Sequence, residues 1–349
     1  MAPSTQANAA GGFVPVIGIR PFLTGDAAQK SQVAKEVDEA CRETGFYVVV
    51  GHGVEQSLLD RTEAVSRAFF ALPAAEKMRL HRDLTGEAGS AGYTAIGDNN
   101  LSYTRGEALP FDLNETIQIA PIDAGDDDYY REGASRGMFP PNRWPESLPE
   151  FKEIYVEYFR RMIKLADDLM RLSALALELP EDYFADKVDR PVSKLAARLY
   201  PEQTQAPLPG QLRAAAHTDY GTVTILKPGN APGGLQVADL QGEWHDVPYV
   251  PGSFVINLGD VMARWTNDRW RSTLHRVVNP PPELRERSRR LSIVFFGHPN
   301  HDVTVSCLPT CQGPDNPPRY PPITVAQYYL AKQNQARVAR FPVPRSAAS

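Results

Sequence analysis

The sequence contains few cysteines: Cys41, Cys307 and Cys311 are the three among its 349 residues. This low and odd count argues against a disulfide framework and indicates a reducing, cytoplasmic environment. Cys307 and Cys311 flank Pro309 without a second thiol pair or a nearby run of histidines. Because a structural zinc site needs four well-spaced ligands, we interpret all three cysteines as ordinary free thiols.

Long apolar segments and an excess of positive charge are also missing. No apolar run approaches the roughly 20 residues needed to cross a bilayer. The formal net charge of −5 leaves no basic surface for nucleic acid or membrane lipids. The first residues, MAPSTQANAAGG, lack the basic and apolar regions of a secretory signal, so we interpret residues 1–12 as a disordered lead-in. We therefore expect a cytoplasmic protein without nucleic-acid or membrane partners, either a monomer or a homodimer.

Internal repeats and hinges rich in Gly and Ser are absent, so we expect the helical first half to pack on the second half as one unit. Apolar residues recur every three or four positions from Phe151 to Leu179, which predicts a long supporting helix. The expected parts are an N-terminal helical and strand region at 13–123, a connecting loop and the long helix at 124–193, a jelly-roll core at 194–310, and a C-terminal helix and tail at 311–349.

The second half contains short segments that are rich in strand-forming residues and are separated by Gly and Pro. Among them are LAARLY, TVTIL, LQVAD, FVINL, TLHRVV, LSIVFF and DVTVS. Evenly spaced short strands with turn signals predict an antiparallel double sheet, so the fold class is α+β with a cupin-like jelly roll. In the first half, residues 86–100 form a loop able to close one side of a pocket. We predict that the acidic run at 126–133 is solvated surface.

A possible metal site lies in the segment RAAAHTDYGTVTIL. Side chains two apart on a strand share a face, so His217 and Asp219 can reach one point, whereas Thr218 and Tyr220 would face away. His275, from a distant strand, would complete a set of two histidines and one carboxylate. Such a set leaves coordination positions open for Fe(II) and oxygen chemistry, although the same residues can also bind zinc with an open position.

Arg290 and Ser292 indicate an anion site beside it. They are also two apart on an apparent strand, so a guanidinium and a hydroxyl face the same way. The rest of this strand consists of Leu, Ile, Val and Phe. Turning an arginine inward on such an apolar strand is costly unless an anion binds it. The pair could hold the far carboxylate of a dicarboxylate ligand.

The order of these motifs, with the segments HTDYGTVTIL, GGLQV, INLGDVMARWTND and STLHRVVNPP, resembles the Fe(II)- and 2-oxoglutarate-dependent dioxygenases of the isopenicillin N synthase-like family. Within that family the sequences of these segments are similar to those of thymine 7-hydroxylases and, more loosely, to those of bacterial ethylene-forming enzymes. The resemblance runs from Val14 to about Tyr329. It implies a double-stranded β-helix that binds Fe(II), 2-oxoglutarate and O2 and hydroxylates or desaturates a small metabolite, giving succinate and CO2. It also implies that Tyr200 donates to the carboxylate held by Arg290 and Ser292.

Substrate contacts are predicted from strand parity and from this resemblance. Phe296 shares the parity of Arg290 and Ser292, and Arg198 shares that of Tyr200, so both should face the cavity. Asn257 and Arg264 are further candidates. Three other histidines are interpreted as structural: His52 in a turn, and His245 and His298 in loops or at the rim.

Three alternatives remain open at this stage. Isopenicillin N synthase and aminocyclopropane-carboxylate oxidase carry the same triad and Arg-x-Ser pair but take no 2-oxoglutarate. A zinc hydrolase or isomerase on a cupin barrel would use the same ligands, although no general base is evident. A barrel that binds without turnover is the third alternative, and the intact triad argues against it.

Overall fold

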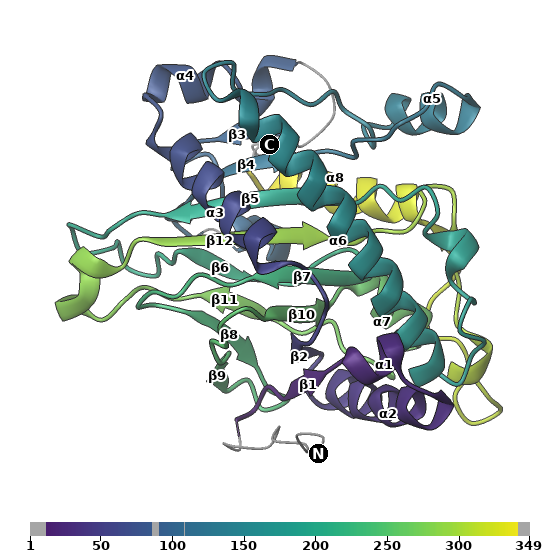
Figure 1. Ribbon diagram of the computed structural model, residues 1–349. Coiled ribbons are helices and arrows are strands. Elements are labelled where there is room, and N and C mark those ends of the chain that lie inside the picture. The colour runs from purple at the N-terminus through teal and green to yellow at the C-terminus, as the bar shows by residue number, and fades with distance from the viewer. Residues whose placement is uncertain (1–11, 86–90, 108, 341–349) are drawn as a thin grey trace, which may run out of the picture.

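Two mostly antiparallel sheets form the centre of the protein (Figure 1). The computed structural model describes residues 12–85, 91–107 and 109–340, so nearly all of the predicted lead-in and the end of the predicted tail lie outside the described residues. The larger sheet has eight strands in the order β1-β2-β10-β7-β12-β5-β4-β3, and the smaller sheet has four in the order β6-β11-β8-β9. The strands of the larger sheet, in that order, are Val16–Gly18, Phe46–Val50, Phe254–Leu258, Val223–Lys227, Arg290–Phe296, Lys194–Tyr200, Glu115–Ile119 and Gly92–Thr94. Those of the smaller sheet are Ala214–His217, His275–Val277, Leu235–Ala238 and Trp244–Asp246.

The two sheets pack face to face through a small apolar cluster. Tyr200 and Val255 of the larger sheet meet Ala214, Val237 and Val277 of the smaller one in this cluster. The fold is therefore the predicted double-stranded β-helix of the α+β class. Polar side chains that share this inner face lie in the space between the two sheets.

The outer face of the larger sheet is covered by helices. Alternation along β12 sends Leu291, Ile293 and Phe295 into the main apolar core, together with residues of α6. The long helix α6 (Pro149–Ala176) crosses this face, as Figure 1 shows, and also packs against α2 (Ala27–Glu43) and α3 (Gln56–Ala71). Its predicted supporting role is thus seen directly. Because the odd-numbered residues of β12 face the helices, Arg290 and Ser292 point to the inner side.

The other helices follow local sequence signals. Helix α2 begins with a capping box at Asp26, and Thr324 caps α8 (Val325–Arg340), because its Oγ1 accepts the Gln327 N–H at 3.2 Å. The remaining α-helices are α1 (Arg20–Thr24), α4 (Ala74–Met78), α5 (Asp128–Ser135) and α7 (Asp260–Trp265). Short 3₁₀ turns span Arg82–Thr85, Leu101–Arg105, Ala185–Lys187, Pro282–Arg287 and Pro309–Cys311, and β13 (Thr304–Val305) pairs with β14 (Ile323–Thr324). Among the described residues, no helix combines the length and apolar character that a membrane crossing requires.

The acidic run at 126–133 is only partly surface. It starts helix α5, and Tyr129 is buried there, with its ring stacked on His301 at a centroid distance of 4.1 Å. Its hydroxyl donates to the Arg190 carbonyl at 2.6 Å. The prediction of solvated surface was therefore wrong for this residue, because helical spacing turns one side of the run inward.

Candidate iron and 2-oxoglutarate site

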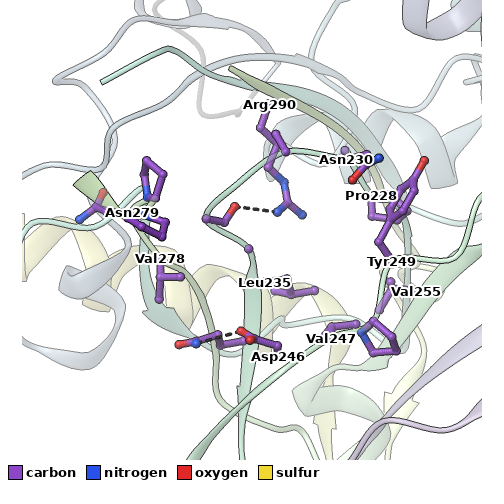
Figure 2. Close-up of a pocket in the computed structure, with 18 residues that line it drawn as sticks. Pro228, Asn230, Leu235, Asp246, Val247, Tyr249, Val255, Val278, Asn279 and Arg290 are labelled. Carbon is purple, nitrogen blue, oxygen red and sulfur yellow. Dashed lines mark hydrogen bonds between the residues drawn. The ribbon is translucent and has the colours of Figure 1, made fainter. Parts of the chain in front are cut away.

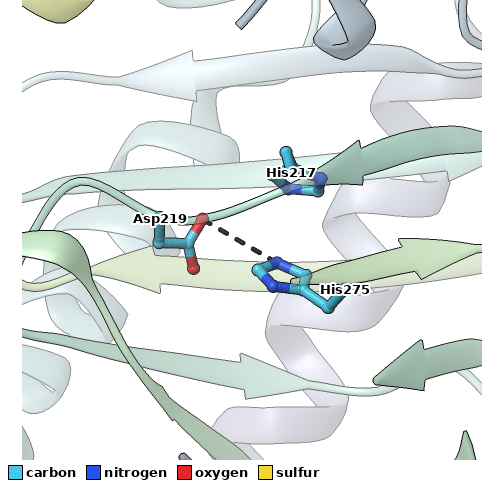
Figure 3. Close-up of side chains that lie close together, drawn as sticks. All are labelled: His217, Asp219 and His275. Atoms are coloured by element: carbon cyan, nitrogen blue, oxygen red, sulfur yellow. Dashed lines mark ion pairs between the residues drawn. The ribbon is translucent and has the colours of Figure 1, made fainter. Parts of the chain in front are cut away.

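Three side chains from two strand ends converge between the sheets (Figure 3). His217 ends β6 and lies directly opposite His275, which begins β11, so their ring centroids are 4.3 Å apart. Asp219 follows two residues after β6, and its Oδ1 is 4.0 Å from His275 Nε2. One ligand atom from each residue fits within a 4.8 Å span, and all three residues are buried. The predicted triad is thus brought together.

The backbone around Asp219 differs from the prediction. The chain leaves β6 after His217, turns, and enters β7 in the other sheet at Val223. The turn needs a glycine, because a Cβ at Gly221 would lie 2.1 Å from the Gly297 carbonyl oxygen. Strand parity therefore fails for Thr218 and Tyr220, which line the cavity beside the triad instead of facing away from it.

Both histidines present the same ring nitrogen to the centre. Nδ1 of His217 lies 2.8 Å from the Ala215 carbonyl, and Nδ1 of His275 lies 3.0 Å from the Thr273 carbonyl. A proton on each Nδ1 leaves Nε2 as a free lone pair. Burial, with the neighbouring His275, lowers the pKa of His217 to about 3, so this imidazole is neutral and suited to bind a metal.

The Asp219 carboxylate is held by two donors on one oxygen. Oδ2 accepts hydrogen bonds from Thr224 Oγ1 at 2.6 Å and Asn257 Nδ2 at 2.8 Å, which leaves Oδ1 facing His275. Burial alone would raise the pKa of Asp219, but the two imidazoles and these hydrogen bonds keep it below its usual value. Asn257 therefore lies behind the carboxylate and not in the cavity, which corrects its assignment as a substrate contact.

These features fit a divalent cation. Among the described residues, no Lys or Arg forms an ion pair with Asp219. A buried carboxylate without a cationic partner is costly, and the two imidazoles beside it complete a set that Fe(II) binds with positions left open.

A second buried charge lies at the start of β12. Arg290 is 5% exposed, and its neighbour across the strand pair is Tyr200. Its Nε donates to Ser292 Oγ at 3.3 Å and its Nη1 to the Gly233 carbonyl at 3.1 Å. No described carboxylate forms an ion pair with it, and burial lowers its pKa. Arg290, Ser292 and Tyr200 thus lie together as predicted, and they suit an anion.

Arg213 strengthens this conclusion, although no sequence pattern singled it out. It is fully buried and donates to the carbonyls of Pro232, Pro201 and Ser288. Burial and the nearby Arg290 lower its pKa to about 10. Neither guanidinium forms an ion pair with a described acid, and Glu202 acts on Arg213 only through its charge. Two buried guanidinium groups close to each other therefore make this end of the barrel attractive to a dianion.

The guanidinium of Arg290 also borders a cavity of about 530 Å³, drawn in Figure 2. Residues of the β7–β8 connection, including Asn230, line it together with Leu235 and Val255. The triad does not line this cavity. The anion site can therefore be approached from a side away from the triad.

The triad borders a different cavity of about 300 Å³. Arg198 and Phe296 line it as predicted, and the Arg198 guanidinium lies 5.9 Å from the centre of the Phe296 ring. Thr94 and Asn99 of the predicted closing loop also line it, but Gly92–Thr94 form strand β3, so the loop prediction was wrong for that part. Residues 86–90 of the predicted loop lie outside the described part. The described lining residues are Arg82, Thr94, Asn99, Leu101, Thr104, Thr116, Gln118, Lys194, Arg198, His217, Thr218, Asp219, Tyr220, Phe296, His298, Tyr329 and Gln333.

Comparison with known proteins decides the family. Residues 191–299 match the 2OG-Fe(II) oxygenase superfamily, and residues 14–147 match the N-terminal region described as non-haem dioxygenase in morphine synthesis. The 2-oxoglutarate-Fe(II) type oxidoreductase hxnY of Emericella nidulans is 35% identical over 316 residues, which cover 89% of this chain and 86% of that protein. The chain belongs to the Fe(II)- and 2-oxoglutarate-dependent oxygenases.

Other relatives agree with this oxygenase assignment. A homoarginine-6-hydroxylase of Arabidopsis thaliana is 34% identical over 81% of both chains. The crystal structure of a full-length Neurospora crassa protein in complex with alpha-KG and 5-formyluracil superposes with a TM-score of 0.78 at 28% identity, covering 96% of this chain and all of that one. This oxygenase is thus an oxidoreductase that uses Fe(II), O2 and 2-oxoglutarate to oxidise a small molecule, and none of the alternative functions gains support.

Two further predictions about the oxygenase need correction. Arg264 does not line the cavity: it lies on α7, donates to the Pro321 carbonyl at 2.9 Å and covers the Tyr320 ring at 4.6 Å, because α7 turns it toward the C-terminal segment. His298 is buried and lines the cavity, because the chain stays against the sheet after β12. Burial, with Lys194 nearby, lowers its pKa to about 3.

His245 and His52 keep structural roles. His245 lies on β9 and pairs with Asp239 at 2.7 Å. His52 contacts the Gly252 carbonyl through Nε2 at 2.8 Å and accepts the Val54 N–H, as expected of a turn residue.

Proposed function

We propose that this oxygenase hydroxylates or desaturates a small metabolite bound in the 300 Å³ cavity, with His217, Asp219 and His275 as its three iron ligands. The observation that supports this most strongly is the position of the triad. Its ligand atoms converge on one point, its carboxylate has no cationic partner among the described residues, and two of its members line the cavity.

We further propose that Arg290, Ser292 and Tyr200 hold the distal carboxylate of 2-oxoglutarate. The guanidinium offers a planar pair of donors, the Ser292 hydroxyl lies 3.3 Å from its Nε, and Tyr200 is its partner on the neighbouring strand. The buried positive charge of Arg290 and Arg213 supports this role, because a dianion would complete it. The first carboxylate and the keto oxygen would then lie toward the triad.

When bound, Fe(II) with O2 and 2-oxoglutarate supplies an oxidant strong enough for an unactivated C–H bond, with conversion of 2-oxoglutarate to succinate and CO2. The residues of this chain position the metal ligands and the substrate, and they exclude water from the cavity. Asn257 and Thr224 fix the direction of the Asp219 carboxylate, while Phe296 and Tyr220 present ring surfaces to the substrate. No side chain needs to act as a general base.

The proposal also covers the size of the substrate, the location of the enzyme and its partners. Ordinary ligand pockets have volumes of about 300–1,000 Å³, and this cavity lies at the low end of that range. It therefore suits a single small metabolite. The named relatives act on or bind compounds of this size, among them 5-formyluracil and homoarginine. The free thiols of Cys41, Cys307 and Cys311 agree with a cytoplasmic location. We propose a monomer or homodimer without nucleic-acid or membrane partners.

An anaerobic titration tests the proposal. The Fe(II) protein is titrated with 2-oxoglutarate while the weak visible charge-transfer band of a chelated oxoacid is followed, and air is then admitted and succinate is measured. We expect a saturable band and slow succinate formation. Iron binding without a band would favour an oxidase that takes no 2-oxoglutarate, and a preference for zinc would favour a hydrolase.

A further inference from the structure

Arg198 is the cavity residue whose charge has no partner among the described residues. It lies in the middle of β5, between Thr116 of β4 and Ser292 of β12, and its side chain lines the cavity. It forms no hydrogen bond or ion pair with any described residue, and its Nε is buried without an acceptor. Its guanidinium carbon lies 5.9 Å from the centre of the Phe296 ring. An unsatisfied guanidinium of this kind is costly unless a ligand completes it.

The charges around Arg198 have the same sign. Arg82 and Lys194 also line the cavity, and both already have partners: Arg82 donates to the Asp98 carbonyl and Lys194 to the Tyr329 hydroxyl. Asp219 is the only acid among the described lining residues, and its free oxygen, Oδ1, lies 4.0 Å from His275 Nε2. The cavity therefore has more positive than negative charge before any metal is bound.

The nearest influence of an acid on Arg198 comes from Asp112, which does not line the cavity. Its two oxygens accept the backbone N–H groups of Leu101 and Ala215 at 2.9 and 2.8 Å. Its interaction with Arg198 is electrostatic only, without an ion pair. The guanidinium edge of Arg198 thus remains available to a ligand.

We infer that the substrate is a small organic carboxylate with a flat ring, whose anionic group binds Arg198 and whose ring packs on Phe296. This inference rests on the function proposed above, because it assigns the substrate of the same site. The planar fork of an arginine matches a carboxylate with two parallel hydrogen bonds. With the carboxylate on Arg198, the ring lies over Phe296, and the rest of the molecule is directed toward the His217 and Asp219 side of the cavity.

The test compares acids with their neutral amides. The Fe(II) enzyme, without oxygen and with saturating 2-oxoglutarate so that Arg290 is occupied, is titrated calorimetrically with benzoate and phenylacetate and with benzamide and phenylacetamide. We expect at least one acid to bind at least about tenfold more tightly than its amide, the scale of a charge-assisted hydrogen-bond pair. Equal affinities, or no binding of either acid, would overturn the inference.

Variants then locate the preference. Arg198→Met should abolish the difference between acid and amide, and Arg198→Lys should keep part of it, because a point charge replaces the fork. Phe296→Leu should weaken acid and amide to the same extent. Arg61→Met, which removes an exposed arginine paired with Glu157, is the control for net charge and should change neither affinity. A preference that survives in Arg198→Met would contradict the assignment.

The order of measurements separates this inference from the proposed function. Binding of 2-oxoglutarate to the unmodified Fe(II) protein is measured first. If the charge-transfer band does not form, the proposed function fails before any substrate probe is used. If the band forms and the acids show no preference over their amides, the function stands and the carboxylate substrate is rejected.

Discussion

Two regions of this protein bury charged side chains in opposite ways. On β4, Glu115 accepts hydrogen bonds from Lys77 Nζ at 2.7 Å and from the Tyr93 hydroxyl at 2.5 Å, and Lys77 also donates to the Phe70 carbonyl. Between the two sheets, by contrast, Asp219 has no cationic side-chain partner and Arg290 has no acidic one among the described residues. The first region is satisfied by the protein alone.

The difference shows where ligands belong. A buried charge is tolerated when it is paired and hydrogen-bonded, and an unpaired one costs several kcal/mol. Folding of the β4 region needs nothing further. The inner face of the barrel presents an unmatched negative group at one place and unmatched positive groups at another, which complement a divalent metal and a dicarboxylate.

The largest effect is expected from Asp219→Ala, which removes the unmatched carboxylate. Turnover should fall below detection and Fe(II) binding should weaken strongly, while the melting temperature should hold or rise, because a buried unpaired charge is lost. Succinate formation, iron titration and a melting curve measure these outcomes. Asp186→Ala, at an exposed position, is the control. Surviving activity in Asp219→Ala would show that the iron assignment is wrong.

Breaking the satisfied pair should affect stability and not the chemistry. Lys77→Met leaves Glu115 buried without its cation, so the free energy of unfolding should fall by about 3–5 kcal/mol in urea denaturation. Lys77→Met combined with Glu115→Leu should recover part of this loss, because neither charge then remains. The folded fraction of both variants should still bind 2-oxoglutarate. A loss below about 1 kcal/mol in the single variant would remove the contrast between the two regions.

Arg290→Met should leave iron binding in place and raise the 2-oxoglutarate concentration needed for half-maximal succinate formation by at least about thirtyfold, since truncating one partner of a buried charge pair costs about 2 kcal/mol or more. Arg290→Lys should lie between this variant and the unmodified protein, because the charge remains without the fork. An unchanged requirement in Arg290→Met would reject the carboxylate site.

The smallest of these effects is expected from Asn257→Leu. Its amide holds Asp219 Oδ2, and loss of such a supporting hydrogen bond weakens metal affinity by about 10- to 100-fold. Competition with a chelator of known affinity measures it. Asn230→Leu, in the cavity beside Arg290, is the matched control and should leave iron affinity unchanged. If Asn257→Leu binds iron normally but loses substrate binding, Asn257 is a substrate contact after all.

Period-two alternation made part of this site predictable from the sequence. The inward positions of Arg290, Ser292 and Phe296 follow from the apolar outward residues between them. The pairing of His217 with Asp219 follows from their spacing of two, and His275 was assigned from the order of the motifs. The turn after His217 did not follow, because the residues that a strand pairs with determine where it ends, and β6 and β7 join different sheets. Thr218 and Tyr220 were misplaced for this reason.

Contacts between distant segments were also beyond sequence reasoning. Asn257 reaches Asp219 from another sheet, 38 residues away, and Arg213 meets Arg290 only after the strands are assembled. Parity gives the face on which a side chain lies but not its neighbour across the barrel. Arg264 shows the same limit, because the direction of α7 and not its sequence removes this side chain from the cavity.

The unmatched charges inside the barrel are, in our interpretation, completed by Fe(II) and 2-oxoglutarate. A crystal structure of the protein grown without oxygen with both ligands tests this most directly. We predict one metal ion bonded to Nε2 of His217, Oδ1 of Asp219 and Nε2 of His275, with the distal carboxylate of 2-oxoglutarate on Arg290. A metal bound elsewhere, or a 2-oxoglutarate molecule that does not contact Arg290, would contradict it.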